Sequence, residues 1–159
     1  MKNAKVLVLV AVVIAAAGVF WAVGNVSSPD APALGVLENE SVVIYKDPNC
    51  GCCEVYASYL KGKGVDVTVN EVSDLSKVKE DFGVPPQLQS CHTMEVGGYV
   101  VEGHVPIEVV ADLLTERPDI DGIALPGMPS GSPGMPGPKA GPFTIYTLGG
   151  ELGDVYTRF

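Results

Sequence analysis

The sequence is poor in positive charge and has no long run of like charges. Among its 159 residues, 10 Lys and Arg are set against 19 Asp and Glu, and the net charge at pH 7 is −9. Nucleic-acid binding depends on clustered Lys and Arg that neutralise phosphates. The composition therefore argues against DNA or RNA as a partner. The scattered acidic residues are typical of a soluble surface and indicate no specific ligand.

The chain also lacks the length for two hydrophobic cores, and no internal repeat is apparent in it. A length of 159 residues suffices for one domain of ordinary size together with a targeting segment. We therefore expect a single folded domain.

The first 24 residues lack a polar face. Lys2 and Lys5 are followed by an uncharged, almost wholly apolar run over residues 6–24. This pattern fits a secretory signal peptide, with a small-residue site ending at Ala33, and the run is equally long enough for an uncleaved membrane anchor. Removing it changes the net charge to −11. Both alternatives predict an extracytoplasmic domain at residues 41–159, preceded by a small, polar linker at residues 25–40.

The domain alternates between strand and helix patterns. Strands are predicted at residues 41–46 and 65–72, helices at 53–64 and 73–83, a hairpin at 93–103 turning at Gly97-Gly98, and a helix from Pro106 to Pro118. Ser73 is the predicted cap of the second helix. This α/β order, with a cysteine turn after the first strand, is that of a thioredoxin-like fold whose first two strands are parallel.

Two further features follow the last helix. Residues 126–142 hold six Pro and five Gly and are predicted to form an extended loop, which either covers another part of the molecule or is disordered. Residues 143–159 read as an additional C-terminal β-hairpin turning at Gly149-Gly150.

Four cysteines are the residues most suited to chemistry. Cys50, Cys52 and Cys53 lie at the predicted start of the first helix, where unpaired N–H groups favour thiolate over thiol. Cys91 lies just ahead of the hairpin, in the loop that faces the cysteine turn in a thioredoxin-like fold. We therefore expect the four thiols to converge.

A cis-proline normally precedes that hairpin strand in thioredoxins. With Thr93 as the first strand residue, His92 takes the place of that proline. Pro85 and Pro86 lie further upstream as turn formers, and either is able to adopt the cis form.

Three interpretations of the thiols compete. A structural disulfide framework suits an exported chain, but bridges within Cys50, Cys52 and Cys53 would close tiny rings and make poor staples. Thiol-disulfide exchange is suggested by the C-x-x-C from Cys50 to Cys53. The extra thiols favour the third interpretation, soft-metal binding, in which crowded thiolates bridge two or more Cu(I) ions. Zinc is a minor alternative, because its sites usually use separated ligand pairs.

Four other residues are weaker candidate ligands. His92 adjoins Cys91, and His104 precedes a predicted helix, where capping or packing is the expected role. Met128 and Met135 lie in the Pro/Gly-rich loop, where their thioethers could close over a copper ion or simply anchor the loop.

Three sequence blocks carry a resemblance to a known family. YKDPNCGCCEVYASYL, VPPQLQSCHTMEVGGYVVEGHVP and GIALPGMPSGSPGM together resemble the CopG-type copper-resistance family, long classed as a domain of unknown function, over residues 41–159. The resemblance implies a thioredoxin-like, periplasmic or otherwise extracytoplasmic protein. It also implies that the four cysteines are copper ligands able to form disulfides.

The sequence thus predicts an extracytoplasmic protein that holds Cu(I) on a cysteine cluster and serves copper tolerance, with redox-coupled capture and release. Copper ions and other copper-handling proteins are the expected partners, together with the membrane if the N-terminal segment is uncleaved. The competing class is an enzyme, either a thiol-disulfide oxidoreductase of thioredoxin-like type or a copper oxidoreductase using the same cysteines.

Overall fold

The computed structural model describes residues 34–38 and 40–159 of the chain. The predicted signal peptide or anchor at residues 1–24, and most of the predicted linker at 25–40, lie outside these residues. Among the described residues, no helix combines the length and the apolar character needed to cross a bilayer.

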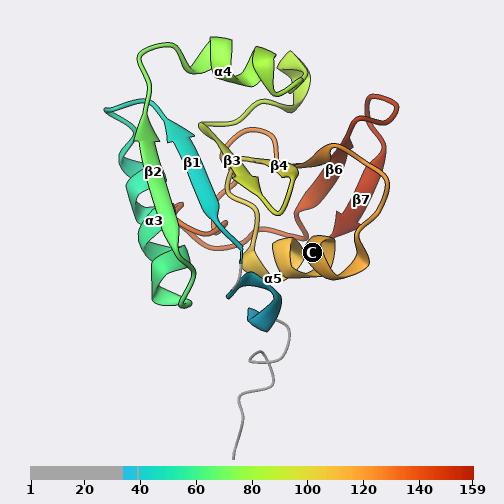
Figure 1. Cartoon of the computed structure of the whole chain (residues 1–159), viewed down its shortest axis with the longest axis horizontal. Coiled ribbons are helices and arrows are strands. Elements are labelled where there is room, and N and C mark those ends of the chain that lie inside the picture. The colour runs from blue at the N-terminus through green and yellow to red at the C-terminus, as the bar shows by residue number, and fades with distance from the viewer. Residues whose placement is uncertain (1–33, 39) are drawn as a thin grey trace, which may run out of the picture. The chain divides into compact units, whose positions relative to one another are not determined.

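A seven-stranded mixed sheet forms the centre of the α/β domain, in the order β2-β1-β3-β4-β5-β6-β7 (Figure 1). The strands are β1 (Val42–Lys46), β2 (Val67–Glu71), β3 (His92–Val96), β4 (Tyr99–Glu102), β5 (Gly122–Ala124), β6 (Thr144–Leu148) and β7 (Val155–Arg158). The helices are α3 (Gly51–Gly62), α4 (Leu75–Asp81) and α5 (Ile107–Glu116), with short 3-10 turns η1 (Gly35–Leu37) and η2 (Pro86–Leu88).

The first unit, β1-α3-β2, confirms the predicted parallel strand pair. β1 and β2 run parallel, with Val42 opposite Val67 and Lys46 opposite Glu71. Helix α3 begins at Gly51, two residues earlier than predicted, so that Cys52 and Cys53 lie within its first turn. Its inner face, including Tyr56 and Leu60, is buried against the sheet because these residues recur at helical spacing.

Helix α4 is shorter than predicted and is capped by a different residue. The Asp74 carboxylate, rather than Ser73, accepts a hydrogen bond from the Lys77 backbone N–H at 3.0 Å. The buried residue of α4 is Lys79, although the sequence pattern predicts an apolar inner face. In the described part of the chain every peptide bond is trans, including those before Pro85 and Pro86.

The predicted hairpin of β3 and β4 is confirmed. Gly97 and Gly98 both have positive φ, at 55° and 87°, which a tight two-residue turn requires and which glycine adopts without strain. Helix α5 follows from Pro106 and ends at Arg117, whose left-handed conformation (φ 47°) stops the helix. The apolar face of α5 is buried.

The C-terminal part contains one strand that the sequence analysis missed. β5 pairs parallel to β4 and antiparallel to β6, and so joins the predicted C-terminal hairpin of β6 and β7 to the sheet. β5 has only three residues and begins at Gly122, which packs directly on the Val100 backbone. A strand this short shows no periodicity. Residues 126–142 form the predicted extended loop, with no helix or strand.

The core extends to residues before Ser41. Leu37, within the segment predicted as a linker, is 1% exposed and belongs to the same buried apolar cluster as Ile44 and Leu113. Glu40 adds an ion pair to Arg117 at 2.8 Å. The end of the predicted linker therefore contributes to the folded unit.

We expect Leu37→Ala to lower the free energy of unfolding by about 2 to 4 kcal/mol, because it removes a buried side chain and leaves a cavity. Val36→Ala, at a half-buried neighbouring position, should cost less than about 1 kcal/mol. Urea denaturation of both variants measures the difference. Equal, small losses would show that the segment before Ser41 does not stabilise the fold.

Candidate metal centre

Four cysteines from two distant segments meet at the N-terminal end of α3. Cys50 is the N-cap of the helix, Cys52 and Cys53 lie in its first turn, and Cys91 immediately precedes β3. All four sulfur atoms lie within 4.8 Å of one another. The pairing of Lys46 with His92 brings the end of β1, from which the cysteine turn departs, beside the start of β3.

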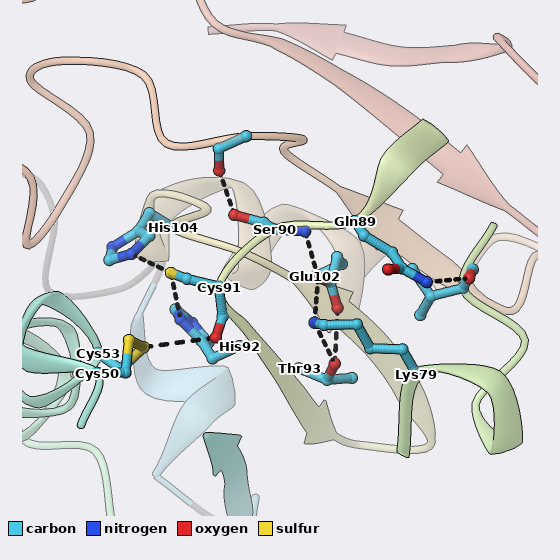
Figure 2. A network of polar contacts seen from close by, with 12 residues as sticks. Cys50, Cys53, Lys79, Gln89, Ser90, Cys91, His92, Thr93, Glu102 and His104 are labelled. Carbon is cyan, nitrogen blue, oxygen red and sulfur yellow. Dashed lines mark hydrogen bonds and ion pairs between the residues drawn. A yellow bond between two sulfur atoms is a disulfide. The ribbon is translucent and has the colours of Figure 1, made fainter. Parts of the chain in front are cut away.

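Two of the four cysteines are joined in a disulfide and two are free. Cys50 and Cys53 form the disulfide (Figure 2), although the sequence analysis judged bridges within this turn unfavourable. This bridge adds little stability, because a bond between residues three apart constrains the unfolded chain little. Cys52 and Cys91 are free thiols. The Cys52 Sγ lies 3.6 Å from the Cys50 Sγ and 3.8 Å from the Cys91 Sγ.

Cys91 does not share the helix N-terminus that favours thiolates. Burial, followed by the proximity of Cys52, raises the pKa of the Cys91 thiol to about 12. Its backbone carbonyl lies 3.6 Å from the Cys53 Sγ. In the metal-free state Cys91 is therefore a neutral thiol, and a metal ion that binds it must displace a proton.

His104 points into the cluster instead of capping α5, where no side chain caps the helix. Its Nε2 lies 2.8 Å from the Cys91 Sγ, and its Nδ1 lies 2.6 Å from the carbonyl oxygen of Pro133. A carbonyl only accepts hydrogen bonds, so Nδ1 carries the proton and the Nε2 lone pair faces Cys91. Burial lowers the pKa of His104, which keeps the imidazole neutral.

His92 is wholly buried beside Cys91. Its Nδ1 lies 3.5 Å from the Cys91 Sγ, and its ring packs on Tyr56 at 4.6 Å between centroids. Among the described residues, its Nε2 has no hydrogen-bond partner. Burial lowers the pKa of His92 well below its ordinary value, and the nearby His104 acts in the same direction. Both histidines are thus neutral, the form that binds metals.

The Pro/Gly-rich loop covers this site. Besides the bond from His104 to Pro133, Gly134 lies so close to α3 that a Cβ atom would be 2.9 Å from the Tyr56 N and 3.0 Å from the Cys52 O. Of the two candidate thioethers in the loop, Met128 is 54% exposed and Met135 is half-buried. The loop therefore packs over the helix start, whereas Met128 faces solvent.

Two buried lysines near the site were missed by the sequence analysis. Lys46, 0% exposed, pairs with Glu54 at 2.8 Å and Glu71 at 3.0 Å, and so ties the end of β1 to the first turn of α3. The Glu54 side chain is the main cause that raises the pKa of Lys46. Lys79 pairs with the fully buried Glu102 at 2.5 Å. A charge at the end of an apolar strand signals Lys46, whereas Lys79 lies within α4 and no sequence pattern marks it as buried.

The donor set fits a soft metal ion. When two thiolates bind one ion, with metal–sulfur distances of about 2.3 Å and a near-tetrahedral angle, their sulfur atoms lie about 3.8 Å apart. The sulfur atoms of Cys52 and Cys91 have this separation. A second group of potential ligands, Cys91, His92 and His104, shares Cys91 with the four-cysteine group. Thiol and imidazole donors of this kind suit Cu(I) and Zn²⁺ better than hard cations.

Comparison with known proteins points to copper. The model of a family described as "Protein of unknown function, DUF411" matches residues 88–135, which include Cys91, His92 and His104. A solved structure named copper resistance protein copG, Form 2, is 38% identical, with a TM-score of 0.69, covering 76% of this chain and 98% of its own. Form 1 is also 38% identical, with a TM-score of 0.68, covering 75% and 96%. No curated protein matches the sequence significantly.

We expect Gly134→Ala to destabilise the protein more than Gly137→Ala. Both glycines have positive φ, at 83° and 89°, so both substitutions incur a backbone cost of roughly 1 to 2 kcal/mol. Only at Gly134 does the new methyl group collide with α3, because the nearest atoms at Gly137 are 3.5 Å away. The collision should add about 1 to 3 kcal/mol in urea denaturation. Equal losses would mean that the loop does not pack on α3 in solution.

Proposed function

The chain belongs to the CopG-type copper-resistance family, and we propose that it binds Cu(I) through the thiolates of Cys50, Cys52, Cys53 and Cys91 in copper tolerance. The observation that carries this proposal is the convergence of four sulfur atoms within 4.8 Å. Cu(I) accepts two or three soft ligands without demanding a tetrahedron, so it tolerates such an irregular group. Both solved relatives are named copper resistance proteins.

The site holds more than one Cu(I) ion in this proposal. Cys91 belongs to both potential ligand groups, one of four cysteines and one with His92 and His104. A thiolate shared in this way is suited to bridge two ions. The Pro133 carbonyl would hold His104 in the tautomer whose Nε2 is free to bind, as the second partner of a metal-bound histidine generally does.

The disulfide supports a redox-coupled version of copper capture. While Cys50 and Cys53 are bridged, only Cys52 and Cys91 offer free sulfur ligands. Two electrons and two protons convert the bridge into two thiols and double the number of available sulfurs. A disulfide bond at this position therefore lowers the affinity for Cu(I), and its reduction restores it.

The thioredoxin-like assignment and the location of the protein are part of the same proposal. The element order β1-α3-β2-α4-β3-β4-α5 and the strand order β2-β1-β3-β4 support a thioredoxin-like arrangement. The N-terminal basic and apolar pattern supports export, with other copper-handling proteins as partners outside the cytoplasm.

We expect the reduced full-length protein to retain more than one Cu(I) ion under anaerobic competition with a strong Cu(I) chelator. Cys91→Ser should retain at least one ion fewer, because it removes the sulfur shared by both ligand groups. Thr115→Ser, a conservative change of a hydroxyl that bonds to Ala111 in α5, is the control and should bind as the unmodified protein does. Complete loss of copper from all three proteins would contradict the proposed function.

We expect Cu(I) affinity to fall at least tenfold when the Cys50–Cys53 bridge is closed, because two of the four thiolates are lost. Chelator competition in defined glutathione redox buffers measures this change. In the double variant Cys50→Ser/Cys53→Ser the affinity should be low even in the most reducing buffer, because only Cys52 and Cys91 remain as sulfur ligands. An affinity that is equal in the bridged and reduced forms of the unmodified protein would refute redox-coupled capture.

A thiol-disulfide oxidoreductase is the second candidate, and the bridge at the start of α3 is the observation that favours it. Against it, β3 begins at His92 and not at Thr93 as predicted, so Cys91 directly precedes the strand, where thioredoxins carry a cis-proline. Catalysis of insulin reduction at a small molar fraction of enzyme, without copper, would favour this candidate over copper binding.

A further inference from the structure

A buried carboxylate lies behind the cysteine cluster. Glu102, the last residue of β4, is 0% exposed and accepts three hydrogen bonds (Figure 2). Its Oε1 accepts from the Lys79 Nζ at 2.5 Å and from the Ser90 backbone N–H at 2.6 Å, and its Oε2 accepts from the Thr93 hydroxyl at 2.7 Å. Lys79 also donates to the Thr93 Oγ1 at 3.1 Å. The network therefore joins α4, β3 and β4.

Stability alone gives a poor reason for this network. Transfer of a lysine and a glutamate out of water is costly, and apolar side chains of similar volume often stabilise a core as well or better. Apolar side chains, however, could not accept the hydrogen bond from the Ser90 N–H, as Glu102 does. That N–H belongs to the residue directly before Cys91.

The position of Cys91 depends on this acceptor. The pairing of β3 with β4 begins at Thr93 opposite Glu102, so Ser90 lies beyond the ladder between these strands. The Ser90 N–H therefore has no strand partner within residues 40–159, and it donates to the Glu102 carboxylate instead. This charge-assisted hydrogen bond is shorter and stronger than a neutral one. The Ser90 hydroxyl donates to the Gly127 carbonyl, and the Gly127 N–H donates to the Gln89 carbonyl at 3.1 Å. The segment before Cys91 is thus held on two sides.

We propose that Glu102, fixed by Lys79, is a positioning residue that holds the Cys91 sulfur at the cluster through the Ser90 backbone N–H. Neither residue touches the metal site itself. The carboxylate sets where the chain enters β3 and hence the distance of 3.8 Å between the Cys52 and Cys91 sulfurs. This inference rests on the proposed function for its effect on copper, but the placement of Cys91 does not require copper.

A pair of double variants separates positioning from stability. In Lys79→Met/Glu102→Gln the buried charges are removed, but the glutamine oxygen still accepts the Ser90 N–H. In Lys79→Met/Glu102→Met the volume is similar and the acceptor is lost. Urea denaturation establishes that each full-length variant is folded under the assay conditions. Single variants are avoided because each would leave an unpaired charge in the core.

The first readout is the Cu(I) affinity of the reduced proteins by chelator competition. The glutamine variant should bind within about threefold of the unmodified protein, and the methionine variant about tenfold more weakly, as expected for one lost charge-assisted hydrogen bond. Equal affinities of the two folded variants would overturn the positioning role.

The second readout uses no copper. In the bridged protein, the rate at which diamide links Cys52 to Cys91, followed by mass spectrometry, reports how close the two sulfurs are held. We expect the methionine variant to react about tenfold more slowly than the glutamine variant. If the unmodified protein retains no copper, the proposed function fails, and this rate alone decides the positioning role. Equal rates in the two variants would overturn it.

Discussion

The antiparallel pairing of β1 with β3 is the constraint on which the cysteine site depends. It sets Lys46, the last residue of β1, opposite His92, the first residue of β3. The cysteine turn follows Lys46, and Cys91 directly precedes His92. The register of this one strand pair therefore brings the thiols of two distant segments together. A slip of one residue would turn every β3 side chain to the opposite face of the sheet and remove Cys91 from the cluster. The parallel pairing of β1 with β2 then directs α3, and with it Cys52 and Cys53, over the same edge.

Three of the potential metal ligands, Cys91, His92 and His104, are uncharged in the metal-free protein. Burial keeps both imidazoles uncharged and raises the pKa of Cys91. The buried formal charges of this region are held in ion pairs, Lys46 with Glu54 and Glu71, and Lys79 with Glu102. A metal ion that binds Cys91 must therefore displace the thiol proton, whereas the two imidazoles are already in the neutral form that binds metals. This explains how an acidic protein can bury several metal ligands without mutual repulsion in the empty state.

The sequence predicts those features that arise from local patterns. The paired glycines identify the hairpin of β3 and β4, and the apolar spacing after the cysteines identifies α3 to within two residues of its start, because both depend on residues close in the chain. The roles of His104 and Glu102 could not be predicted in this way. His104 is oriented by Pro133, 29 residues away, after the Pro/Gly-rich loop has folded back over the helix. Glu102 is recognisable only once its register with Thr93 is known.

The segment at Cys91 is held by two sets of contacts, one from the Glu102 network and one from the Pro/Gly-rich loop. On one side the Glu102 network is buried and charged, and it bonds the backbone at Ser90 without involving any of the thiols. On the other side, the Pro/Gly-rich loop contacts this segment twice, through the bonds of Gly127 to Gln89 and Ser90 and through His104, whose Nε2 faces the Cys91 sulfur. When the Cys50–Cys53 bridge opens, the new thiols appear on α3, beneath the segment at Gly134. If Glu102 holds the backbone at Ser90 as proposed, a rearrangement that accompanies copper loading falls to the start of α3 and to the part of the loop at Gly134 that packs on it.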